Sequence, residues 1–168
     1  ATGFGARHRR ITGDQYDMFS IDFEMENGVH LHSMCRQIDG CSNAVGEIVY
    51  GTKGSWNSFD HEIKDLAGNV IWKYNEEEQN ALFQQHNPYV LEHVDAINHI
   101  RKGEGLDEAT ACAISTLAGV MGREAAYSGA TVTWDEMSQS ELNLMPEKLE
   151  IGPMDMSQYT VKTPGSAK

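Results

Sequence analysis

Two runs of alternating residues, joined by Asn27-Gly28, constrain the fold of this chain more than any other feature. Before the turn, every second position is large and apolar: Phe19, Ile21, Phe23 and Met25. A period of two is typical of a strand with one buried face. After the turn, alternation puts a polar and chemically capable set on one face: His30, His32, Met34 and Arg36. Because Asn-Gly is the strongest short hairpin signal, we predict an antiparallel hairpin at the centre of the fold.

Strand patterns continue to Lys73 without an intervening helix, and a second hairpin is predicted around Ala67-Gly68-Asn69. Helical periodicity begins at Asn87-Pro88, a good N-cap followed by a proline suited to the first helical position, and ends at Gly103. A second helix is predicted from near Asp107 to Ser128. Strands first and helices second predict an α+β fold, an open-faced antiparallel β-sheet with helices packed on one face.

The end of the chain differs from the rest in composition. Thr133-x-x-Glu136 is a capping box, which predicts one more short helix. From residue 144 onward three prolines disfavour regular structure: Pro146, Pro153 and Pro164. We therefore expect one domain over residues 1–143 and an extended arm over 144–168.

The charge of the chain excludes two classes of partner. A net charge of −12 argues against nucleic acid and anionic membrane surfaces, because both require a basic footprint. No apolar run approaches the roughly 20 residues of a membrane span. The cysteines Cys35, Cys41 and Cys112 cannot all pair and form no C-x-x-C motif, so we interpret them as reduced thiols. We expect a cytoplasmic location, with a periplasmic one as the alternative.

Two motifs that would indicate a metal or a nucleotide are incomplete. His30-x-His32 offers two imidazoles from one strand face, but Arg36 and Gln37 stand where such a site needs an acidic ligand. Gly3-Phe4-Gly5 resembles the start of a G-x-G-x-x-G loop, but no strand precedes it and His8 replaces the third glycine. We therefore predict no metal and no cofactor bound by this chain alone.

A basic cluster, Arg7-His8-Arg9-Arg10, stands out in so acidic a chain. One interpretation is a frayed and solvated terminus. The other is a clamp for an anion or a hydroxyl group, because guanidinium groups offer forked donors to carboxylate, phosphate or sugar oxygens. The residues themselves leave both interpretations open.

Several short segments together resemble the carboxyl-terminal domain of the Gfo/Idh/MocA oxidoreductases. In the first half they are Ala1-Thr2-Gly3-Phe4-Gly5-Ala6-Arg7, Asn27-Gly28-Val29-His30, Cys35-Arg36-Gln37 and Gly51-Thr52-Lys53-Gly54. In the second half they are Asn87-Pro88-Tyr89, Glu92-His93, Ile100-Arg101-Lys102-Gly103, Met121-Gly122-Arg123 and Thr133-Trp134-Asp135-Glu136. The resemblance covers residues 1 to about 155 and lies in the order and spacing of these segments.

The resemblance implies an enzyme of two domains. An amino-terminal Rossmann domain binds NAD or NADP and carries a Glu-Lys-Pro motif whose lysine acts in catalysis. The second domain supplies an open-faced sheet, part of the sugar pocket and the oligomer interface. Pro146-Glu147-Lys148 is a permuted order and not that motif, and the aspartate and histidine of many members are not recognisable here. We therefore expect the Rossmann domain to be absent from this chain, which alone would be inactive.

On this resemblance the chain is expected to be the substrate-binding and oligomerisation half of an NAD(P)-dependent oxidoreductase, or of an NAD-using glycosidase, acting on a sugar or glycoside. The residues expected to line the sugar pocket are Arg7, His8, Arg36 and Gln37. A homodimer or higher homo-oligomer is expected to form through the open sheet face. The alternative is a non-catalytic assembly or carbohydrate-binding module.

Overall fold

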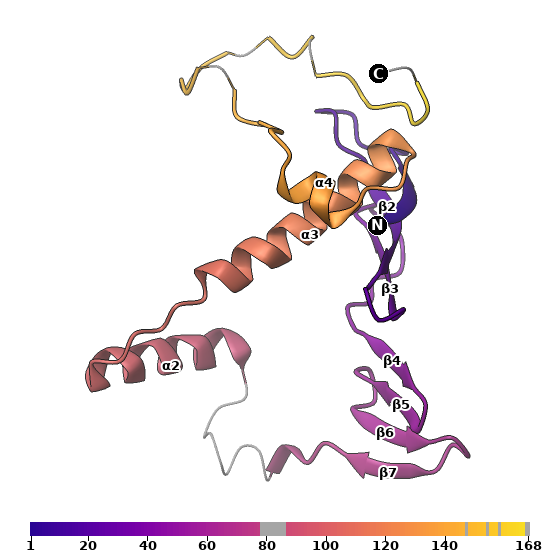
Figure 1. Ribbon diagram of the computed structural model, residues 1–168, viewed down its shortest axis with the longest axis vertical. Helices are drawn as coiled ribbons and strands as arrows, with labels where there is room; N and C mark the ends of the chain where they lie inside the picture. The colour runs from indigo at the N-terminus through magenta and orange to yellow at the C-terminus, as the bar shows by residue number, and fades with distance from the viewer. Residues whose placement is uncertain (78–86, 147, 154, 158, 167–168) are drawn as a thin grey trace. The chain divides into compact units, whose positions relative to one another are not determined.

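The computed structural model describes residues 1–77, 87–146, 148–153, 155–157 and 159–166 (Figure 1). The chain divides into two compact units, one made of residues 1–41 with 108–168 and the other of residues 42–107. Each unit has its own antiparallel sheet, and helices follow the strands along the chain, so the predicted α+β class is confirmed. The sequence patterns do not predict that the strands divide between two sheets. A period of two shows which face of a strand a residue occupies, but not which strand lies beside it.

The first unit contains a three-stranded sheet in the order β1-β2-β3. Its strands are β1 (Thr2–Ala6), β2 (Met18–Glu24) and β3 (His30–Arg36). The predicted Asn27-Gly28 turn joins β2 to β3: Gly28 has φ 74°, and the N–H of Met25 donates to the carbonyl of Val29 at 2.9 Å. The predicted Asn27-Gly28 hairpin is therefore confirmed, with β3 as the edge strand of the sheet and not its centre.

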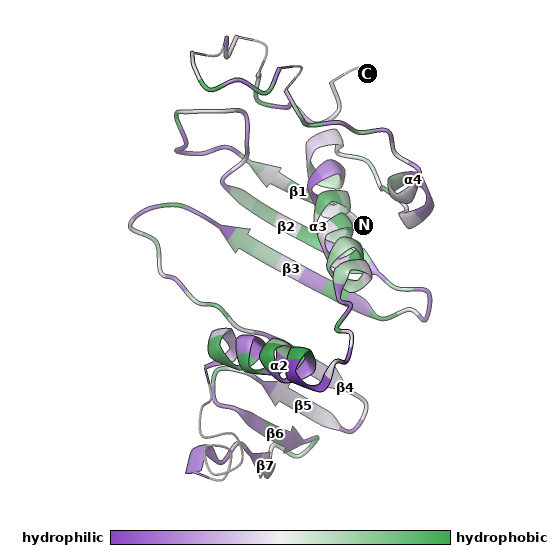
Figure 2. Ribbon diagram, turned by 90° about the vertical axis from the view of Figure 1, so that its left-hand side faces the viewer, coloured by the Kyte–Doolittle hydropathy of each residue, from purple (hydrophilic) through white to green (hydrophobic). Residues whose placement is uncertain are grey.

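Helix α3 (Ala109–Ser128) packs against β1 and β2 and, among the described residues, makes no contact with β3 (Figure 2). Gly122 allows the approach, because a Cβ there would lie 2.7 Å from Cζ of Phe23. Within the sheet, a Cβ on Gly3 would lie 2.8 Å from Cδ1 of Ile21 in the neighbouring strand β2. Gly3 thus sits in a strand that packs closely on its neighbour. The α3 contacts bury Ile21, Met121, Ala125 and Ala126.

Successive side chains of a strand point to opposite faces of the sheet, so the residues that alternate with those facing α3 lie on the other side. We call this surface the open face. The register aligns Phe4, Ser20 and Met34 in one row across it. Phe4 and Met34 are 70% and 76% exposed. The open face therefore carries large apolar side chains that the described part of the chain does not cover.

The carboxyl-terminal end of α3 anchors the segments that follow it. Helix α4 (Trp134–Ser138) opens with the predicted capping box, in which Thr133 and Glu136 bond to each other's main chain, and it buries Met137. Beyond it, the Oη of Tyr16 donates to the carbonyl of Lys162 at 2.8 Å. Tyr16 also packs edge-on against Tyr127 at 4.7 Å between ring centroids. These contacts hold the last residues against α3.

The second unit contains a four-stranded meander in the order β4-β5-β6-β7. Its strands are β4 (Ile48–Gly51), β5 (Gly54–Asn57), β6 (Glu62–Asp65) and β7 (Val70–Lys73). The turn at residues 66–69 confirms the second predicted hairpin, and Asp65 fixes it by accepting the N–H groups of Ala67 and Asn69 at 2.9 Å each.

Helix α2 (Pro88–Lys102) belongs to the same unit and has the predicted caps. The side chain of Asn87 accepts the N–H of Tyr89, and Gly103 ends the helix in the left-handed conformation. None of its residues is buried, and its ribbon in Figure 2 alternates between green hydrophobic and purple hydrophilic residues. Within the described residues, no helix is long and apolar enough to cross a membrane.

Candidate functional site

The register of the three-stranded sheet brings the four predicted substrate residues to one end. Ala6, Met18 and Arg36 form its last row, so Arg7 and His8 leave β1 where β3 ends at Arg36 and Gln37. Main-chain bonds extend this row by one residue. The N–H of Asp17 donates to the carbonyl of Ala6 at 3.0 Å, and the N–H of Gln37 donates to the carbonyl of Asp17 at 2.8 Å.

We call this region the arginine end, comprising residues 7–10, Asp17, Arg36 and Gln37. Asp17 is its one buried polar side chain, at 3% exposure. Its carboxylate accepts the main-chain N–H groups of Arg9 at 2.7 Å, Arg10 at 3.0 Å and His8 at 2.8 Å. These hydrogen bonds, that of Arg9 above all, lower the pKa of Asp17 to about 2 against the opposing effect of desolvation. The carboxylate is therefore ionised at neutral pH and fixes the path of the loop.

Sequence reasoning missed Asp17, although the sequence holds a signal for it. Asp17 falls in the same alternation as Phe19, Ile21 and Phe23, the apolar set of the first predicted strand. A charged residue in register with a buried face needs a partner, because an unpaired buried charge is costly. The strand begins at Met18, one residue after Asp17, and the partner is the main chain of the basic cluster.

The guanidinium group of Arg7 holds the same loop. It donates to the carbonyl oxygens of Arg10 and Gly13. Arg10 in turn donates to Oε1 of Gln15 at 3.5 Å. These contacts favour a hydrogen-bonded loop over the interpretation of a frayed terminus, and Arg7 contributes to the loop as a positioning residue.

The arrangement at the arginine end suits binding of anions or hydroxyl groups. Arginine side chains supply only donors, and the carboxylate of Asp17 is occupied by main-chain N–H groups. An ionised carboxylate with a pKa of about 2 is a weak base, so Asp17 is poorly suited to accept a proton from substrate. The residues gathered here can hold and orient a ligand.

The polar half of the open face contains two histidines in defined contacts. Nδ1 of His30 lies 2.7 Å from Oδ2 of Asp22, and Nε2 of His32 lies 3.0 Å from Oγ of Ser20. The hydrogen bond that His30 donates to the carboxylate of Asp22 raises the pKa of His30 above its ordinary 6.5. In the part of the chain that the structure describes, no three side chains of His, Cys, Asp or Glu are placed to hold a metal ion.

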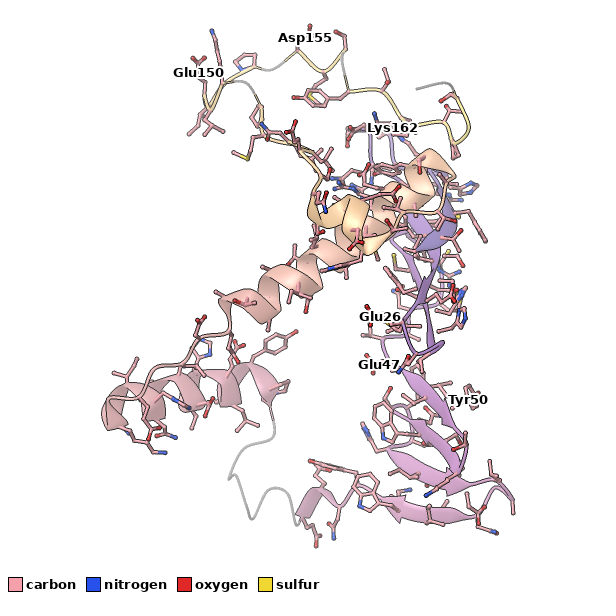
Figure 3. All side chains as sticks on the ribbon, in the orientation of Figure 1. Glu26, Glu47, Tyr50, Glu150, Asp155 and Lys162 are labelled. Carbon is pink, nitrogen blue, oxygen red and sulfur yellow. The ribbon has the colours of Figure 1, made fainter. Side chains whose placement is uncertain are left out.

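A cleft of about 510 Å³ lies where the last residues of the chain meet the end of α3. Lys162 stands at this position in Figure 3. The segment is held by the N–H of Gly165, which donates to the carbonyl of Ser128 at 3.1 Å. The lining residues are Glu124, Tyr127, Ser128, Ala130, Lys162, Thr163, Gly165 and Ser166. Sequence reasoning did not find this cleft, because it depends on a contact between segments far apart in the chain.

Comparisons with protein-family models, with curated proteins and with solved structures give no match. The resemblance to the Gfo/Idh/MocA oxidoreductases therefore stays a prediction from the sequence.

Proposed function

We propose that this chain is the substrate-binding and oligomerisation half of an NAD(P)-dependent oxidoreductase, or of an NAD-using glycosidase, that acts on a sugar or glycoside. One observation carries the proposal: a sheet covered by α3 on one side and open on the other gathers the predicted substrate residues at one end. Support also comes from the resemblance of the sequence.

The open face is the surface proposed for oligomerisation. Phe4 and Met34 lie in one row with the hydroxyl of Ser20 between them, and His32 and then His30 occupy the next two rows on one side. Interfaces combine an apolar centre, in which methionine and aromatic residues are enriched, with polar groups around it. The composition of the open face fits that description better than it fits a plain solvated surface.

The arginine end is the surface proposed for substrate. This surface comes from two different segments, which lie at the same end of the sheet in its register. Its residues are Arg7, His8, Arg36 and Gln37. Residues contributed by several strand ends are a common way to build a binding site on a rigid scaffold. Arg36 lies at the junction of the two surfaces, since alternation puts it on the open face as well.

The Gly3-Phe4-Gly5 segment does not have the surroundings of a dinucleotide-binding loop. A phosphate-binding glycine loop must join a strand to a helix, so that the helix amino terminus faces the phosphate. Gly3 and Gly5 instead lie inside β1, and the next element is the strand β2. Under this proposal NAD or NADP is held by a Rossmann domain, which supplies the hydride chemistry.

The alternative function is a non-catalytic assembly or carbohydrate-binding module, and the state of Asp17 is compatible with it. The buried carboxylate of the arginine end is fully engaged by main-chain N–H groups and supplies no general base. A module of this kind would bind sugar and self-associate without turnover.

The coding sequence upstream of Ala1 separates the two functions. A strand followed by G-x-G-x-x-G and a Glu-Lys-Pro motif would support the oxidoreductase, whereas a start codon next to Ala1 would favour the module. In the two-domain enzyme, Arg36→Ala should lower kcat/KM by about tenfold or more, and Arg101→Ala in α2 serves as the control. Unchanged kinetics with an altered oligomeric state would assign Arg36 to the interface.

A further inference from the structure

The arginines of this chain are unevenly distributed. Four of the six lie at the arginine end, and the remaining two are in helices: Arg7, Arg9, Arg10 and Arg36, against Arg101 and Arg123. The chain as a whole has 25 acidic residues and a net charge of −12. So local a concentration of guanidinium groups in an acidic protein indicates a requirement for positive charge at this place.

Within the part of the chain that the structure describes, the loop arginines Arg7, Arg9 and Arg10 form no ion pairs. Other cations lie within 4.0 Å of a carboxylate oxygen: Lys64, Lys73, Lys102 and Arg123. Between the described residues, no carboxylate lies within that distance of the guanidinium of Arg7, Arg9 or Arg10, although Asp14 and Asp39 occur in the flanking segments.

Asp17 makes this possible. Because its oxygens accept main-chain N–H groups, it fixes the loop without pairing with the arginine side chains. The guanidinium of Arg9 has no hydrogen bond to another described residue, while its main chain is tightly held. A loop ordered before binding loses less entropy when a ligand arrives.

We propose that the arginine end binds the oxyanion of an acidic sugar, either the carboxylate of a sugar acid or the phosphate of a sugar phosphate. Guanidinium groups bind both oxyanions through paired, charge-assisted hydrogen bonds. A neutral sugar offers only hydroxyl groups and leaves the positive charge of the site uncompensated. The inference rests on the proposed function for the sugar part of the ligand, and it names the class of substrate.

Calorimetric titration of the 168-residue chain at low salt tests this inference. The probes are D-glucuronate, D-glucose 6-phosphate, D-glucose and inorganic phosphate. The two acidic sugars, or one of them, should bind saturably, D-glucose should not, and added salt should weaken the binding. Arg9→Gln should weaken binding about tenfold, because one charge-assisted contact is lost, and Arg101→Gln should leave it unchanged.

The outcomes separate this inference from the function on which it rests. Binding of D-glucose as tight as that of D-glucuronate would overturn the acidic substrate and leave the sugar-binding function intact. If inorganic phosphate bound as tightly as D-glucose 6-phosphate, the site would recognise the oxyanion alone, and the inference that the ligand is a sugar would be overturned. Absence of binding by all four probes, in a chain that still self-associates, would overturn the anion site and leave the oligomerisation function standing. Circular dichroism of each variant establishes that it is folded.

Discussion

A carboxylate that accepts several main-chain N–H groups is stabilised in its ionised form. At Asp17 this effect makes the stability of the folded chain depend on pH. The folded pKa is about 2, and the ordinary value is 3.8. Between these values the unfolded chain binds more protons than the folded one. The contribution of Asp17 to stability is therefore fully present above about pH 4 and is lost as the pH falls toward about 2.

We expect Asp17→Asn to lower the stability of the first unit at neutral pH, since a neutral amide accepts these hydrogen bonds less well and brings two donors to a site full of donors. In thermal unfolding, the difference in Tm between wild type and variant should become smaller as the pH falls from about 4 to about 2. Glu26→Gln, in the exposed turn after β2, is the control. A gap independent of pH would contradict an ionised, N–H-bound Asp17.

The placement of many individual residues could be predicted from the sequence. The residues whose roles were not predicted depend on contacts that are not local in the chain. The alternation placed His30, His32, Met34 and Arg36 on one face, as the register confirms. The role of Asp17 was not predicted because it depends on a loop that folds back over seven to nine residues. Local periodicity contains no information about which main-chain groups a buried carboxylate meets.

At the scale of elements, α3 is the helix that makes the first unit a two-layer structure. Its first half is exposed, and its second half approaches the sheet closely enough that Gly122 has no room for a side chain. Gly119, three residues earlier, has nothing within 4 Å of a Cβ position. The two glycines share a helix and differ in surroundings, so they form a matched pair.

We expect Gly122→Leu to destabilise the chain and Gly119→Leu to stabilise it. In the helix both replacements gain about 0.5–1 kcal/mol of helix propensity. At Gly122 the added side chain must displace Phe23 and Ile21, which costs about 1–3 kcal/mol or more. Urea unfolding of the two variants measures the difference, and equal stabilities would show that α3 does not dock on β2 as described.

The elements themselves were largely predictable because their signals are local. The Asn27-Gly28 turn, the Asn87 and Gly103 caps and the Thr133 capping box each involve neighbours in sequence, and each is confirmed. The division of the strands between two sheets was not predictable, since it depends on which edges meet. The close packing of Gly3 against Ile21 is of the same kind.

At the scale of the whole molecule, the exposed apolar side chains of the open face are the feature that matters most. Phe4 and Met34, which lie in one row of this face, are 70% and 76% exposed. Only six apolar residues are buried among those that the structure describes: Tyr16, Ile21, Met121, Ala125, Ala126 and Met137. Exposed apolar side chains on one sheet face favour burial against a partner, which agrees with the proposed role in oligomerisation.

We expect the chain to self-associate through the open face at about ten micromolar and above, most simply as a two-fold dimer. Light scattering should then give about twice the monomer mass of 18.7 kDa. Met34→Lys should weaken the dimer, because the new charge would be buried without a partner. Met156→Lys, at a site 51% exposed in the carboxyl-terminal arm, is the control. A wild-type mass near 18.7 kDa would refute self-association.

The way Asp17 binds the basic loop also has a kinetic consequence for the main chain. Amide protons in exposed loops normally exchange with solvent rapidly, because their opening costs little. Those of His8, Arg9 and Arg10 are hydrogen-bonded to a buried carboxylate and should exchange slowly, as observed by NMR after transfer to heavy water. In Asp17→Asn this protection should be lost, while the amide of Gln37, bonded to a main-chain carbonyl, keeps its own. The exchange rates of these three amide protons would thus show separately whether each hydrogen bond to Asp17 is formed.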